Sequence, residues 1–160
     1  MFWFIANTLS GSQRLLRSLS RWYFPGPNVA RTRLSSMSFM KLSAIPVIVQ
    51  DASGYVGQSI PIGVCVKLLD RYGPDKVLFK PEGAPNGPNI SALRDATGGK
   101  ARIFEGSGGV SLIDSYRRGI SGTMPGMELL DGVVPAWRAL ARGDGEAGYR
   151  IHLPVGAFVA

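Results

Sequence analysis

The stretch Val77-Leu78-Phe79-Lys80-Pro81 decides the fold, because it is a short apolar run that ends in a lysine and a proline. Three more runs of similar length occupy residues 45–50 (IPVIVQ), 101–105 (ARIFE) and, more weakly, 120–124 (ISGTM). A continuous apolar run of this length, closed by Gly, Pro or polar residues, is typical of a strand buried on both faces. We therefore expect four buried strands.

Helical patterns separate these runs. Apolar residues recur at helical spacing over residues 60–72, 89–97, 111–118 and 128–142, and glycines follow most of these segments. Strands that alternate with amphipathic helices predict a parallel sheet and an α/β fold. Two architectures remain open from the pattern alone, a doubly wound open sheet and part of a (β/α)8 barrel.

Composition limits the chemistry. The chain has 160 residues, 45% of them hydrophobic, with a single cysteine, Cys65, and a single histidine, His152. One cysteine excludes a disulfide within the chain. A single Cys and a single His also argue against a metal site built from these residues. We expect Cys65 to be a buried apolar residue of a helix, and His152 to pack or hydrogen-bond near the C-terminus. The sequence predicts neither a metal nor an organic cofactor.

The positive charge is concentrated at the N-terminus. The formal net charge is +7, yet the 12 basic and 11 acidic residues after position 41 leave only +1 there. Residues 1–41 contain no acid and six basic residues, namely Arg14, Arg17, Arg21, Arg31, Arg33 and Lys41. We therefore divide the chain into a basic extension, residues 1–43, and a near-neutral α/β domain, residues 44–160, which has no electrostatic signature of nucleic-acid binding.

The extension has the composition of an organelle transit peptide, rich in Arg and Ser and free of acids. A leader unrelated to the domain is a second interpretation, and binding to nucleic acid or a membrane surface is a third. We expect a cytoplasmic protein, or an organelle-targeted one if the extension is a transit peptide. No run reaches the roughly 18 apolar residues of a membrane-spanning helix.

Lys80 is the residue whose position points to chemistry. It ends a predicted parallel strand, and barrel active sites lie where such strands end. An amine partly removed from water favours its neutral form, which can attack a ketone to form a Schiff base. A lysine that merely extends its amine to solvent is the alternative from the residue alone.

Four motifs together resemble the C-terminal half of the dihydrodipicolinate synthase / N-acetylneuraminate lyase family of Schiff-base aldolase barrels. IPVIVQDASGYVG (45–57), VLFKPEG (77–83), ARIFEGSGG (101–109) and RRGISGTMPG (117–126) are similar to its fifth to eighth strands in order and spacing. The resemblance covers about 110 residues, 45–154. It implies a partial (β/α)8 barrel of about four C-terminal βα units that acts as a lyase on a 2-oxo acid such as pyruvate or a keto-sugar acid.

The resemblance also implies the site. Lys80 corresponds to the family's Schiff-base lysine, which works without a cofactor in aldol cleavage, condensation or dehydration. The residues expected to bind substrate around it are Gln50, Asp51, Glu82, Gly106, Ser107, Gly108 and Thr123. Glu105 ends a strand nearby, but we expect it to be a solvated loop carboxylate.

Two departures from the family pattern matter. Gln50 stands where the family has a proton-relaying tyrosine, and glutamine exchanges no proton near neutral pH. The family's first four strands have no counterpart, so four strands would leave two open edges and favour a homo-oligomer. The alternative function is therefore a truncated, inactive barrel that acts only as an interaction module or is a relic.

Overall fold

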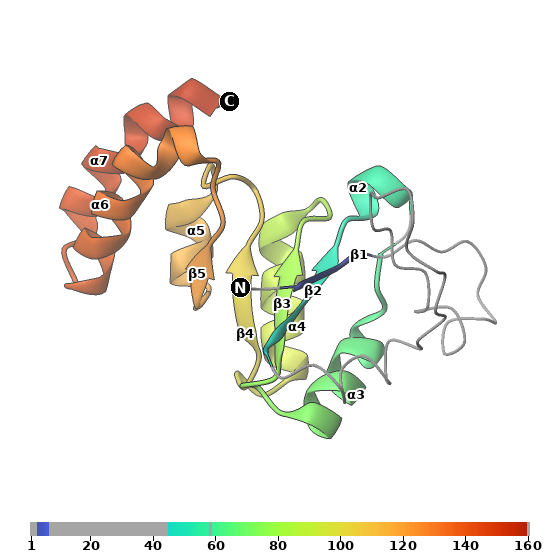
Figure 1. Ribbon diagram of the computed structural model, residues 1–160. Helices are drawn as coiled ribbons and strands as arrows, with labels where there is room; N and C mark the ends of the chain where they lie inside the picture. Colours follow the sequence, from blue (N-terminus) through green and yellow to red (C-terminus); the bar gives the residue numbers. More distant parts are fainter. Residues whose placement is uncertain (1–2, 7–44, 58, 160) are drawn as a thin grey trace.

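A computed structural model describes residues 3–6, 45–57 and 59–159 of the chain (Figure 1). Its five strands are β1 (Trp3–Ala6), β2 (Val47–Asp51), β3 (Val77–Pro81), β4 (Arg102–Glu105) and β5 (Gly122–Thr123). The helices are α2 (Ser53–Val56), α3 (Ile62–Tyr72), α4 (Asn86–Ala96), α5 (Leu112–Arg117), the 3-10 turn η1 (Met127–Leu129), α6 (Leu130–Ala141) and α7 (Gly145–Val159).

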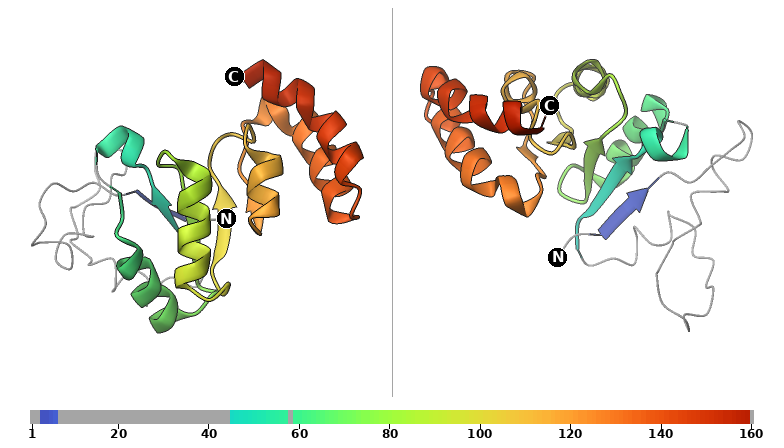
Figure 2. Two further views of the ribbon diagram at one scale, coloured as in Figure 1. Left: turned by 180° about the vertical axis from the view of Figure 1, so that it is seen from behind. Right: turned by 90° about the horizontal axis from the view of Figure 1, so that it is seen from above.

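The strands form one parallel sheet in sequential order, β1-β2-β3-β4-β5. Helices α3 and α4 pack on the same face of it, as the two views of Figure 2 show. A doubly wound sheet would place helices on both faces and reverse its strand order partway. The α/β fold is therefore part of a (β/α)8 barrel, in which each strand follows its predecessor around one axis.

All four predicted strands and all four predicted helices are present, with shifted ends. The strand at 45–50 begins at Val47, since Pro46 has no N–H to donate to a ladder. The last strand shrinks to Gly122–Thr123. Helix α7 was not predicted, because Gly148, Pro154 and Gly156 weaken the helical pattern.

Strand β1 was also not predicted. Trp3–Ala6 pairs in parallel with β2, from Trp3 opposite Val47 to Ala6 opposite Gln50. Strand β1 therefore extends the sheet beyond β2, and among the described residues the sheet still ends in two edges, at β1 and at β5. Aromatic and β-branched residues favour strands, so the Trp-Phe-Ile run carried the signal. The rest of the basic extension, residues 1–2 and 7–43, lies outside the described residues.

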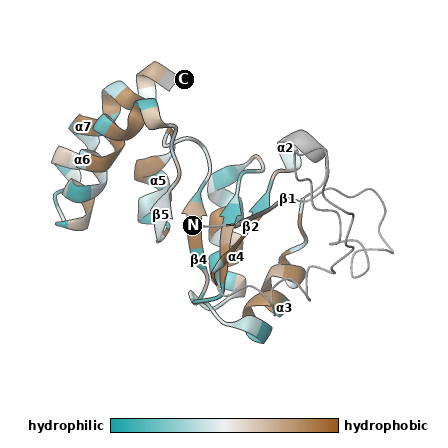
Figure 3. Ribbon diagram, viewed as in Figure 1, coloured by the Kyte–Doolittle hydropathy of each residue, from teal (hydrophilic) through white to brown (hydrophobic). Residues whose placement is uncertain are grey.

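The main core lies between the sheet and helices α3 and α4. Alternate strand residues point into it, among them Val49, Phe79 and Ile103, each at most 4% exposed. Figure 3 shows the apolar stretches of these strands and of α3. Residues one position along each strand, such as Gln50 and Lys80, point to the opposite face, which corresponds to a barrel's interior.

A second core joins α5, α6 and α7 beside β5. It contains Leu112, Val133 and Leu140, and the rings of Tyr116 and Trp137 meet edge to face with centroids 5.2 Å apart. His152 of α7 is 6% exposed, and its Nε2 lies 2.6 Å from the Gly109 carbonyl oxygen. The expectation that His152 packs near the C-terminus is confirmed. In the described ranges, no helix is long and apolar enough to cross a membrane.

Candidate active site

Lys80 is held at the C-terminal end of β3, on the face opposite the helices. The sequence places it there because strand residues alternate, and Phe79 is committed to the helix-side core. Gln50 of β2 is its register partner, so the two side chains share that face. The Lys80 side chain is only 11% exposed. The Lys80 amine therefore does not point outward into solvent.

Glu82 joins the two partners. Its Oε1 accepts a hydrogen bond from Lys80 Nζ at 2.7 Å, and its Oε2 accepts one from Gln50 Nε2. The main-chain N–H of Glu82 donates to the Asp51 carbonyl oxygen at 3.0 Å, which fixes the turn after the strand. The Glu82 side chain is 17% exposed, so it is a largely buried partner of the amine.

Gly106, the first residue after β4, lies directly against this network. A Cβ at this position would come within 2.2 Å of Glu82 Cγ and 3.2 Å of Lys80 Cε. Because the first distance is shorter than any carbon–carbon contact, the position accepts only glycine while Glu82 stays in place. Four residues expected in the site are thus brought together: Gln50, Lys80, Glu82 and Gly106.

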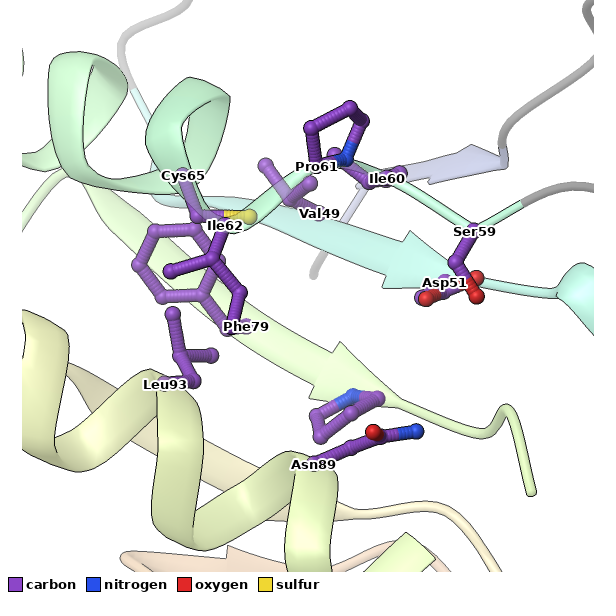
Figure 4. Close-up of a pocket in the computed structure, with 11 residues that line it drawn as sticks. Val49, Asp51, Ser59, Ile60, Pro61, Ile62, Cys65, Phe79, Asn89 and Leu93 are labelled. Carbon is purple, nitrogen blue, oxygen red and sulfur yellow. The ribbon is translucent and has the colours of Figure 1, made fainter. Parts of the chain in front are cut away.

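Asp51 is not part of this group. It lies one residue beyond Gln50, so its side chain points to the helix side of the sheet, where it lines a cavity of about 290 Å³. Figure 4 shows Asp51 beside Ser59 at the polar end of this cavity, with Cys65 and Phe79 in its apolar part. The cavity is therefore separated from Lys80 by the sheet itself.

Cys65 is a buried helix residue, as expected, at 7% exposure. Burial, with a smaller effect from the nearby Asp51 carboxylate, raises the pKa of its thiol to about 12. The thiolate is the nucleophilic form of cysteine, so this residue is chemically quiet at neutral pH.

Ser107 and Thr123 gather around Glu105 instead of Lys80. The Thr123 hydroxyl donates to Glu105 Oε2 at 2.6 Å, and the Ser107 main-chain N–H donates to Oε1. The Ser107 hydroxyl oxygen accepts the Ser111 N–H at 3.1 Å. Gly108 continues the loop with a positive φ of 71°, a conformation that favours glycine.

Glu105 itself is fully buried, at 0% exposure, so its expected role as a solvated loop carboxylate is wrong. Its burial depends on Asn86 and Thr123, which lie 19 and 18 residues away in the sequence. Neither Asn86 nor Glu105 was among the expected site residues. A carboxylate placed directly before a Gly-Ser-Gly-Gly turn was the available signal. Among the described residues, no group of three or more His, Cys, Asp or Glu side chains is arranged to hold a metal ion.

Comparison with known proteins finds similarity in structure alone. The sequence matches no protein-family model and no curated protein. Dihydrodipicolinate synthase from Aquifex aeolicus aligns with a TM-score of 0.65 and 20% identity, over 75% of this chain and 41% of that one. The Rhodopseudomonas palustris enzyme aligns with a TM-score of 0.59 and 22% identity, over 71% of this chain and 40% of its own.

At these identities the similarity shows the fold. The described part of the chain has the architecture of part of the dihydrodipicolinate synthase barrel. The chain spans about two fifths of the length of these enzymes.

Proposed function

We propose that this chain carries the Schiff-base site of a dihydrodipicolinate synthase-like lyase, with Lys80 as the nucleophile. The observation that supports this most directly is the 2.7 Å contact between the largely buried Lys80 amine and Glu82 at the end of a parallel strand. The substrate is a 2-oxo acid such as pyruvate or a keto-sugar acid, and the chemistry is aldol-type cleavage or condensation, or dehydration.

Glu82 is the proton acceptor in this proposal. Its carboxylate takes a proton from the Lys80 ammonium, and the freed amine attacks the ketone carbon to give a carbinolamine. Glu82 then returns the proton to the carbinolamine hydroxyl, which leaves as water, and the protonated imine remains. The imine draws electrons from the neighbouring carbon–carbon or carbon–hydrogen bond, and hydrolysis later restores the amine.

Gln50 orients this acid–base pair. Glutamine exchanges no proton, but its amide N–H donates to Glu82 Oε2. This leaves Oε1 directed at Lys80 Nζ. The role that a tyrosine has in the family pattern therefore passes, in our proposal, to a carboxylate two residues after the lysine.

Borohydride trapping tests the proposal. Incubation of the full chain with pyruvate and sodium cyanoborohydride should add the mass of one reduced adduct, located at Lys80 by peptide mass spectrometry. Lys80→Arg should abolish the adduct, whereas Lys100→Arg, a change at an exposed position, should not alter it. A wild type that gains no adduct, or a Lys80→Arg variant that gains the same one, refutes the Schiff-base role.

A second candidate is a chain without activity that serves as an interaction module or is a relic. The open sheet of the described residues favours it, because unpaired strand edges promote association. It predicts self-association, broad thermal unfolding and no pyruvate adduct. Size-exclusion chromatography with light scattering and calorimetry distinguishes the candidates, since a species that melts cooperatively and forms the adduct supports the lyase.

A further inference from the structure

Glu105 is a carboxylate buried completely within the fold, on the face of β4 turned away from Lys80. It is 0% exposed and shares its face with Ile103, which belongs to the helix-side core. Burying a polar group costs free energy unless hydrogen bonds replace the lost water. An apolar side chain would fill this volume without that cost, so the carboxylate calls for an explanation beyond packing.

Its hydrogen bonds join three separate parts of the fold. Thr123 of β5 donates to Oε2 at 2.6 Å, and Asn86, the first residue of α4, donates to Oε1 at 3.4 Å. The third donor is the main-chain N–H of Ser107, in the loop after β4. One side chain therefore ties this loop to the neighbouring strand and to the start of a helix.

The loop that Glu105 holds, Gly106-Ser107, lines the Lys80 site. Gly106 stands between Glu105 and Ser107, and a Cβ added to it would lie 2.2 Å from Glu82 Cγ and 3.2 Å from Lys80 Cε. Gly106 has no side chain to anchor it. Its position is therefore set by its two neighbours, Glu105 and Ser107. Glu105 is held by its own hydrogen bonds, and it accepts a hydrogen bond from the Ser107 N–H.

We propose that Glu105 is a positioning residue, which holds the Gly106-Ser107 main chain against the Lys80–Glu82 pair. This proposal rests on the proposed function, because the position matters only if a substrate reacts there. A 2-oxo acid bound at Lys80 would lie against the Gly106-Ser107 main chain. Loss of the Glu105 hydrogen bonds allows that main chain to move. Reactive groups displaced by about 1 Å lose much of their rate advantage.

The Ser107 N–H also acquires a defined role. Ser107 was expected to bind substrate, but its main-chain N–H donates to Glu105 Oε1. In the proposal the Ser107 N–H holds the loop in place, and other groups bind the substrate.

The test measures adduct formation against pyruvate concentration in the full chain. Glu105→Gln keeps the shape of the side chain but replaces one carboxylate oxygen with an amide NH2 group. That group is a donor, and it would face the donors that now bond to Glu105. Because the displaced loop no longer fits the substrate beside Lys80, we expect the half-saturating pyruvate concentration to rise by about tenfold, with the adduct still formed at saturation. Glu146→Gln, at an 84% exposed carboxylate of α7, is the matched control and should behave as wild type.

A second pair of variants covers the case in which Glu105→Gln fails to fold. Thr123→Val removes one donor to Glu105 and should raise the half-saturating concentration, whereas Thr123→Ser keeps the hydroxyl and should restore it. If folded variants of Glu105 or Thr123 have the same half-saturating pyruvate concentration as wild type, the positioning role is wrong and the Schiff-base role stands. Absence of an adduct in wild type overturns the proposed function itself, and this role with it.

Discussion

Replacement of Gly106 by alanine is the sharpest perturbation that the site offers. The added methyl group would lie 2.2 Å from Glu82 Cγ, where ordinary contacts begin at 3.4 Å. The backbone of Gly106 has no positive φ, so the substitution acts through this collision alone. Either Glu82 or the loop must move by about 1 Å to relieve it.

The consequence follows from the 2.7 Å hydrogen bond between Lys80 Nζ and Glu82 Oε1. A displacement of about 1 Å takes this pair beyond hydrogen-bonding distance, and a misplacement of that size costs about 100-fold in rate. Overpacking also lowers the free energy of unfolding, by about 1–3 kcal/mol. We expect Gly106→Ala to fold and to form the pyruvate adduct about 10- to 100-fold more slowly than wild type.

The assay is a time course of borohydride trapping, read by intact-protein mass spectrometry, together with urea unfolding of the same samples. Gly63→Ala is the matched control, because its Cβ would meet nothing within 4 Å and it lies in helix α3. That variant should be more stable by up to about 1 kcal/mol and react at the wild-type rate. A folded Gly106→Ala protein that also reacts at the wild-type rate would refute the geometry argued for Lys80 and Glu82.

Three further predictions concern the cores. The pKa of the Cys65 thiol is raised to about 12, so native protein at pH 8 should react slowly with a disulfide reagent, and stability should fall as the pH rises above 9.0. Rapid labelling without unfolding would contradict this. Phe79→Ala should lower the free energy of unfolding by about 3–5 kcal/mol in urea titrations. His152→Ala should lower it by about 1–3 kcal/mol, since the buried Gly109 carbonyl loses its partner.

The strands were predictable because parallel strands covered on both faces need apolar residues at nearly every position. Residues 77–79 satisfy this requirement, and all three are at most 2% exposed. Strand β5 was harder to bound, because Gly122 and Thr123 pair with only two residues of β4. Helix α7 escaped prediction because its stability comes from packing against α6, and not from helix propensity.

The Lys80 site was predictable in part, and register explains which part. Parallel strands bring their C-terminal ends to one edge, so Gln50 and Lys80 had to meet once both were placed on strands. Asp51 is adjacent in sequence to Gln50, yet alternation sends it to the other face. Glu105 follows the same rule, since it shares a face with Ile103 and not with Phe104. Its partners were not predictable from local sequence, because they come from the next helix and the next strand.

This alternation divides the polar residues at the strand ends into two groups with different consequences. Lys80, Gln50 and Glu82 occupy the face where a barrel's substrate would lie, and Glu105 with Thr123 occupies the face toward the helices. Gly106 links the two groups, because it follows Glu105 in the chain and a Cβ added to it would lie 3.2 Å from Lys80 Cε. In the proposed mechanism, a change at Glu105 on the helix side therefore alters the reactivity of the Lys80 amine, which it does not touch, through the main chain of Gly106.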